Sequence, residues 1–275
     1  MPVQFIVVGQ WQGSASSRAM RLGDGAQAIA ADLPRSATTT VDVPAGAGDR
    51  LETAIARYTS VRSVAEAVSE EVRVASEPVL VIGGDGAVVL GAAAACTPAT
   101  TFVRLSGSAG FRALNRAQPV AAENAAVRIL TERPTDLFPG LVTLATDHVL
   151  VVGPRGVEDA ERNALDRAGI RLLDADAADP DSIRAAVDAT GPDGVFVHVD
   201  LDVLDPGEVD GLLEPVPFGF DGAELLAALA AATAGRPLAG AAITGFAPVD
   251  PSRAVDDMGV ILRIVGALSA ASRVS

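Results

Sequence analysis

The sequence predicts an α/β protein built on a mainly parallel sheet with helices on both faces. Short runs rich in Val and Ile alternate with longer stretches whose apolar residues recur at helical spacing. Strand–helix–strand alternation of this kind is typical of parallel sheets. Apolar residues make up 49% of the chain and aromatic residues only 4%, so Ala, Val and Leu must fill the core. Because no linker or repeat interrupts this pattern, we expect a single domain over residues 1–275.

Eight runs are predicted as strands. The first follows the N-terminus without a basic lead-in, so we interpret it as a strand and not as a signal peptide. The others are short, apolar and bounded by Gly, Pro or polar residues. The runs are Val3–Val8, Thr38–Val43, Val79–Ile82, Thr101–Leu105, His148–Val152, Ile170–Leu173, Val195–Leu201 and Leu238–Thr244.

Helices are predicted between most of these strands. The predicted helices are Glu52–Ala75, Ala87–Ala95, Glu158–Ala168, Asp181–Ala189, Asp221–Ala232 and Met258–Ala271. The least regular stretches are Gln10–Gly25, Ser106–Ala122 and Thr131–Thr146. Because loops after the strand C-termini form the ligand crevice of an open parallel sheet, the first two stretches are candidates for a site.

The charge balance excludes some partners. The chain has 35 acidic and 21 basic residues, a net charge of -14, which disfavours nucleic acid and anionic membranes. No apolar run has the length of a membrane span, so we expect a cytoplasmic protein without membrane contact. We interpret the acidity as an ordinary surface, with attraction of a small cationic ligand as the alternative. The single cysteine, Cys96, is expected to be a small core residue.

A candidate site lies at the end of the predicted strand Val195–Leu201. Side chains alternate along a strand, so His198, Asp200 and Asp202 share one face. Two such carboxylates in a partly buried crevice repel each other and need a cation, a basic partner or a shared proton. The alternative is that one Asp caps a turn while the other is solvated, but the full run His-x-Asp-x-Asp-x-x-Asp-Pro favours a site or the remains of one.

This run resembles the signature of the arginase/agmatinase (ureohydrolase) family, an Asp-x-Asp-x-x-Asp-Pro followed by a Pro-containing loop and a helix that carries Glu. Further blocks follow in the family's order. Residues 81–91 resemble its Gly-Gly-Asp-His block, residues 153–161 its Gly-x-Arg segment, and residues 10–15 and 21–26 the opening of a bacterial branch. The resemblance covers almost the whole chain, which is identified as a divergent member with degenerate metal-binding motifs.

The resemblance implies a three-layer α/β/α fold with an eight-stranded sheet, which agrees with the eight predicted strands. It also implies two Mn²⁺ ions held by His and Asp, with a bridging hydroxide that attacks a guanidinium carbon. Family members commonly form trimers or hexamers, so a homo-oligomer is expected.

The sequence departs from the family at its metal ligands. Gly86 stands where the first His is expected, and the second ligand block maps to Ser106, Ser108 and Gly110. A His-Gly pair that shuttles protons maps to Glu123-Asn124. The family's late Glu, which holds the cationic end of the substrate, is missing from residues 244–251. The residual metal ligands are therefore Asp200 and Asp202.

We therefore predict an arginase-family protein without the binuclear Mn²⁺ centre, a pseudoenzyme with a binding or regulatory role. The alternative is a hydrolase of guanidino or amidine C–N bonds with a reduced site, in which Asp200 and Asp202 hold one Mn²⁺. His198 and Glu123 are its candidate catalytic residues, and Asp85 is a further candidate ligand. A third interpretation is metal-free binding of a small molecule by polar residues of the loop Gln10–Gly25.

Overall fold

The computed structural model describes residues 3–132 and 137–273, and one eight-stranded sheet organises it. All strand pairs are parallel, in the order β2-β1-β3-β8-β7-β4-β5-β6. All eight predicted strands and the predicted fold class are confirmed. The strands are β1 Gln4–Val8, β2 Thr38–Thr40, β3 Val79–Gly83, β4 Thr100–Leu105, β5 Val149–Val152, β6 Arg171–Leu173, β7 Gly194–Asp200 and β8 Leu238–Thr244. Residues 133–136 of the third irregular stretch lie outside the described residues.

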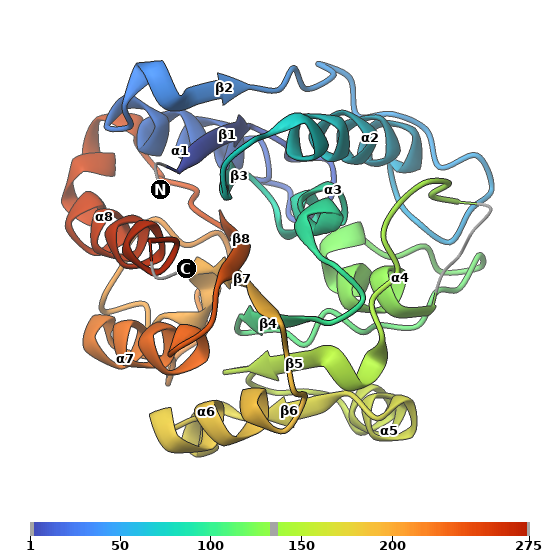
Figure 1. Cartoon of the computed structure of the whole chain (residues 1–275). Coiled ribbons are helices and arrows are strands. Elements are labelled where there is room, and N and C mark those ends of the chain that lie inside the picture. The colour runs from blue at the N-terminus through green and yellow to red at the C-terminus, as the bar shows by residue number, and fades with distance from the viewer. Residues whose placement is uncertain (1–2, 133–136, 274–275) are drawn as a thin grey trace.

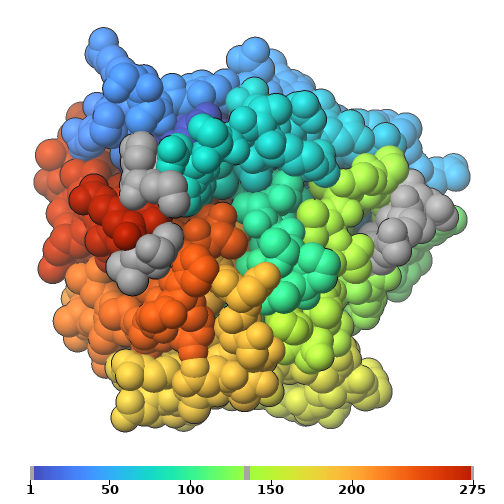
Figure 2. Space-filling view, viewed as in Figure 1, coloured from blue at the N-terminus to red at the C-terminus, as the bar shows by residue number. Residues whose placement is uncertain are grey.

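Helices cover both faces of the sheet, so the molecule has three layers (Figure 1). One face carries α1 Arg21–Ala31, α6 Pro180–Asp188, α7 Gly222–Thr233 and α8 Ala254–Ala271. The other carries α2 Tyr58–Val74, α3 Val89–Ala92, α4 Ala126–Glu132 and α5 Asp159–Ala168. In the space-filling view the red and orange C-terminal helices lie opposite the cyan and green helices of the second face (Figure 2).

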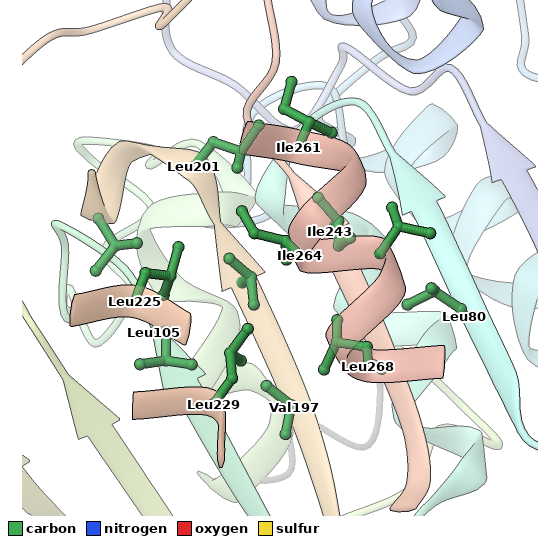
Figure 3. Close-up of a cluster of buried hydrophobic side chains, with 14 of the residues drawn as sticks. Leu80, Leu105, Val197, Leu201, Leu225, Leu229, Ile243, Ile261, Ile264 and Leu268 are labelled. Atoms are coloured by element: carbon green, nitrogen blue, oxygen red, sulfur yellow. The ribbon is translucent and has the colours of Figure 1, made fainter. Parts of the chain in front are cut away.

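Side chains from alternate positions of the strands form two separate cores. On the first face, Val197 and Val199 of β7 pack with Leu225 of α7 and Ile264 of α8. Figure 3 shows this cluster, in which the leucines and isoleucines of α7 and α8 point toward the strands. Phe196 belongs to the second core, so the even-numbered residues of β7 face α2, α3 and α4.

The helices differ from the sequence-based expectation mainly at their starts. The helix expected from Glu52 begins at Tyr58, because Glu52 and Arg57 have positive φ values of 57° and 55° and cannot belong to a right-handed helix. Neither α1 nor α4 was predicted, and α1 begins within a stretch that we expected to be irregular. Helix α8 begins at Ala254 and not at Met258. Within the described residues, no helix is both long and apolar enough to cross a membrane.

Candidate functional site

His198 and Asp200 lie on the same side of β7, which ends at Asp200, whereas Asp202 lies beyond the strand and lines the same cavity as Asp200. His198 is fully buried and Asp200 nearly so, while Asp202 follows in a short 3₁₀ turn. Beyond them lies a cavity of about 90 Å³. Its lining includes Asp200, Asp202 and two further acidic residues, Glu123 and Glu214. The crevice therefore combines several carboxyl groups in a small volume.

A buried arginine that the sequence analysis did not single out lies beside these carboxyl groups. Arg104, the fifth residue of β4, is 1% exposed and also lines the cavity. It lies directly opposite His198 in the β4–β7 ladder, and its Nη1 is 2.9 Å from Nδ1 of His198. Nη2 donates to the hydroxyls of Ser106 at 3.1 Å and Ser108 at 3.2 Å. One guanidinium thus connects β4 to β7 and to the loop after β4.

This contact fixes the protonation state of His198. An arginine can only donate hydrogen bonds, so Nδ1 of His198 accepts and carries no proton. The ring proton is then on Nε2, which donates to the Thr244 hydroxyl of β8 at 2.8 Å. Burial, followed by the charge of Arg104, holds the pKa of His198 well below its ordinary value. His198 is therefore a neutral link in a row from Arg104 to Thr244, with both ring nitrogens bonded within the protein.

Asp202 is held by the loop after β4. Its Oδ1 accepts from the Ser106 hydroxyl at 3.0 Å and from the backbone N–H of Gly107 at 2.8 Å. Burial, and next the neighbouring Asp200, raise the pKa of Asp202 to about 7, although Arg104 opposes this shift. The Ser106 hydroxyl therefore joins the guanidinium of Arg104 to the carboxyl group of Asp202.

Asp85 supports the first loop of the chain. Its Oδ2 accepts from the backbone N–H of Gly13 at 2.7 Å, and its Oδ1 accepts from that of Ala87 at 2.8 Å. An added Cβ at Gly13 would lie 2.2 Å from Oδ1 of Asp85, so this approach requires a glycine. Burial raises the pKa of Asp85 to about 7. The geometry uses Asp85 to fix a turn and a loop.

Glu123 closes the crevice from the opposite side. Its Oε1 accepts from the backbone N–H of Ala15 at 3.1 Å, and its own N–H donates to the carbonyl of Gly13. Burial, and next the charge of Asp85, raise the pKa of Glu123 well above its ordinary value. Glu123 faces the cavity with its carboxyl group already bonded to the loop.

Polar side chains of the first loop also bond within the protein. Gln12 is fully buried and its amide donates to the carbonyls of Pro44 and Gly46 at 2.6 and 3.1 Å. Arg18 donates to the carbonyl of Leu213 at 2.6 Å, which ties this loop to the one after β7. These contacts hold the loop over the crevice.

The residues present do not fit the binuclear manganese site that the resemblance implies. Gly86 and Gly110 offer no ligand atom on a side chain, and Ser106 and Ser108 offer hydroxyls that already contact Arg104. Across residues 3–132 and 137–273, no three His, Cys, Asp or Glu side chains are grouped to hold one ion. A guanidinium in the same crevice also adds a positive charge that repels a divalent cation.

Sequence reasoning missed Arg104 and Glu214. Arg104 had a visible signal, because a charged residue in the middle of an apolar central strand must find partners in the interior. The loop after β7 folds back over the strand end, partly because Arg155 donates to the carbonyls of Val203 and Val216 at 3.0 and 3.2 Å. No local pattern predicts that Glu214 then reaches the cavity.

Comparison with known proteins places this chain and its fold among arginases. The model of the arginase family matches residues 112–261. The N(omega)-hydroxy-L-arginine amidinohydrolase of Streptomyces lavendulae is 32% identical over 123 residues, which span 44% of this chain and only 43% of that relative. The Entamoeba histolytica arginase, solved with L-ornithine, superposes with a TM-score of 0.78 at 16% identity and covers 97% of both chains. Proclavaminate amidino hydrolase of Streptomyces clavuligerus superposes with a TM-score of 0.76 at 17% identity, over 100% of this chain and 92% of that one. Structural likeness at such identities concerns the fold.

Proposed function

Because the chain belongs to the arginase family, we propose that it is a member without the binuclear manganese centre and the guanidino hydrolysis of that family, acting by binding or regulation. The observation that carries the proposal is the position of the Arg104 guanidinium. It bonds to Ser106 and Ser108, two positions at which the resemblance places metal ligands. A built-in cation there opposes the binding of two divalent ions.

The groups around the cavity support a binding role more than a hydrolytic one. Hydrolysis requires an activated water, and the acids that would activate one are already engaged. Asp202 bonds to Ser106 and Gly107, and Glu123 bonds to Ala15. Glu214, whose carboxyl group lines the cavity and takes part in none of these bonds, is suited instead to a small monovalent cationic ligand, such as an ammonium or amidinium group, through charge-assisted hydrogen bonds.

The proposal includes the assembly expected from the resemblance and the location expected from the sequence. We propose one domain over residues 1–275 that forms a trimer or hexamer in the cytoplasm, where it regulates or completes an assembly with an intact relative. Sedimentation at several protein concentrations measures the assembly, and a monomer throughout would contradict this part of the proposal.

Metal content is the first test. The purified chain is incubated with excess Mn²⁺, dialysed, and analysed for manganese by elemental mass spectrometry, with a matching assay of urea release from guanidino substrates. We expect no tightly held ion and no urea. Two ions per chain together with urea release would contradict the proposal.

A reduced metal site is the second candidate, because Asp200, Asp202 and Glu123 line the same cavity. In this alternative Asp200 and Asp202 hold a single Mn²⁺, which would supply an activated water. One ion per chain, lost in the double variant Asp200→Ala/Asp202→Ala, would favour it. Asp179→Ala is the control, because Asp179 is an acidic residue that caps α6 far along the chain from these ligands. Retention of the ion in the double variant would contradict this alternative.

A further inference from the structure

We propose that the guanidinium of Arg104 is the built-in cation of this crevice, and that the chain contains a guanidinium-binding site filled by its own side chain. The inference rests on the proposed loss of the metal centre and deepens it. It assigns one physical cause to four substitutions that are separate in the sequence, at positions 86, 106, 108 and 110.

All four positions surround the same guanidinium. Ser106 and Ser108 contact it through their hydroxyls, and Ser108 also accepts from Nε of Arg104 through its carbonyl at 3.3 Å. An added Cβ at Gly110, which has a φ of +66°, would lie 3.3 Å from Nε. An added Cβ at Gly86 would lie 3.8 Å from Nη1 of Arg104 and 3.0 Å from Oδ2 of Asp200. The two serines therefore bind the guanidinium, Gly110 leaves room for it, and Gly86 leaves room for the Asp200 carboxylate beside it.

Four acceptors surround the guanidinium of Arg104 and engage all three of its nitrogens. His198 accepts from Nη1, the two serine hydroxyls accept from Nη2, and the Ser108 carbonyl accepts from Nε. All of these partners are neutral, and the side chain is among the largest that are fully buried. Such an arrangement selects a guanidinium over an ammonium, because its acceptors match donors in a fixed plane.

The surrounding carboxyl groups explain why a cation is needed there. Asp200, Asp202 and Glu123 line one cavity with Arg104, and an added Cβ at Gly86 would lie 3.0 Å from Oδ2 of Asp200 and 3.4 Å from Cβ of Glu123. Carboxylates placed so close together repel one another, and a cation among them reduces that repulsion. Arg104 is connected to Asp202 through the hydroxyl of Ser106. Where the resemblance implies two metal ions among these carboxyl groups, this chain places one positive side chain, that of Arg104.

The first test removes the cation and returns it in solution. In Arg104→Ala, we expect the melting temperature to fall by about 10 °C, because four buried acceptors lose their donor and a cavity is left. Millimolar guanidinium chloride should then raise that temperature relative to the same concentration of NaCl, while urea, a neutral molecule of similar shape, should not. Affinity is limited to the millimolar to high-micromolar range because the ligand is so small.

Arg128→Ala is the matched control. Arg128 also donates to a backbone carbonyl, that of Phe111 at 3.0 Å, and its guanidinium lies 4.0 Å from that residue's ring, but it sits at the edge of an open cleft. Guanidinium should lower the melting temperature of Arg128→Ala and of the natural chain alike. The inference is overturned if Arg104→Ala is as stable as the natural chain, or if guanidinium and urea affect it equally.

A second measurement on the natural chain does not depend on the variant folding. In ¹⁵N-arginine NMR spectra, the side-chain N–H signals of Arg104 should exchange slowly with water and shift in Ser108→Ala. Rapid exchange of these signals, as for a surface arginine, would overturn the inference. Metal content remains a separate result, so a chain without manganese in which Arg104 is dispensable would refute the inference and leave the proposed function standing.

Discussion

Replacing His198 by Leu tests whether the row from Arg104 to Thr244 stabilises the sheet. Leucine fills a similar volume but offers no acceptor to Nη1 of Arg104 and no donor to the Thr244 hydroxyl. A buried neutral donor or acceptor that is left without a partner costs about 1–3 kcal/mol, and a charged donor left without a partner costs more. Because all three residues are fully buried, we expect the free energy of unfolding to fall by about 3–5 kcal/mol.

The assay is urea unfolding followed by circular dichroism, with the midpoint and slope fitted together. His198→Gln is the control, because its amide offers both an acceptor and a donor and should recover part of the loss. Equal stability of the Leu and Gln variants would refute the reasoning, since it would show that volume and not hydrogen bonding sets the contribution of His198. A loss of unfolding free energy below about 1 kcal/mol in both variants would also refute the reasoning.

Three further predictions concern other parts of the molecule. Gly245→Ala should lower the free energy of unfolding by about 3 kcal/mol or more, because the φ of Gly245 is +91° and the new Cβ would lie 2.3 Å from Oδ1 of Asp200. Gly235→Ala is the control in the same urea assay and should lower it by only about 1 kcal/mol, because Gly235 has a φ of +69° and open space around it. The pKa of Asp202 is raised from 3.8 to about 7, so between these pH values the folded chain holds a proton that the unfolded chain has lost. The contribution of this proton to stability is full below the ordinary pKa and is lost as the pH rises through 7, and Asp202→Asn should flatten the measured pH dependence by on the order of 4 kcal/mol. Burial raises the pKa of the Cys96 thiol to about 12, so alkylation of Cys96 by iodoacetamide at pH 8 should be slow in the folded chain and fast in urea. Fast alkylation of the folded chain would contradict the burial of Cys96.

The sheet could be predicted from the sequence because its signal is local. Each strand is a short apolar run, and the alternation along β7 correctly separated Val197 and Val199 from His198 and Asp200. Helix α1 was not predicted, because Gly23 and Gly25 weaken the helical pattern. Gly25 is explained only by tertiary structure, since an added Cβ would lie 1.9 Å from the carbonyl oxygen of Phe246.

The candidate site could be predicted only in part. The motifs located Asp200 and Asp202 and the positions at which ligands are absent. They did not show that Arg104 fills the space between those positions, because that contact depends on the register of β4 against β7. Register depends on both strands, and these two lie about ninety residues apart in the chain, so no motif within one strand can specify it.

The strand order also has a consequence for how the chain is made. β1 to β3 form one side of the sheet and β4 to β6 the other, while β7 and β8, the last strands in the sequence, lie between them. As the chain leaves the ribosome, the two earlier groups have no direct edge to share, so neither can close the sheet until the C-terminal strands arrive. The hydrogen-bonded row of Arg104, His198 and Thr244 crosses this central seam. These buried polar groups therefore remain without their native partners until late in folding. The strand edges at this seam are paired last, so they are the part of the sheet that needs protection from aggregation for the longest time.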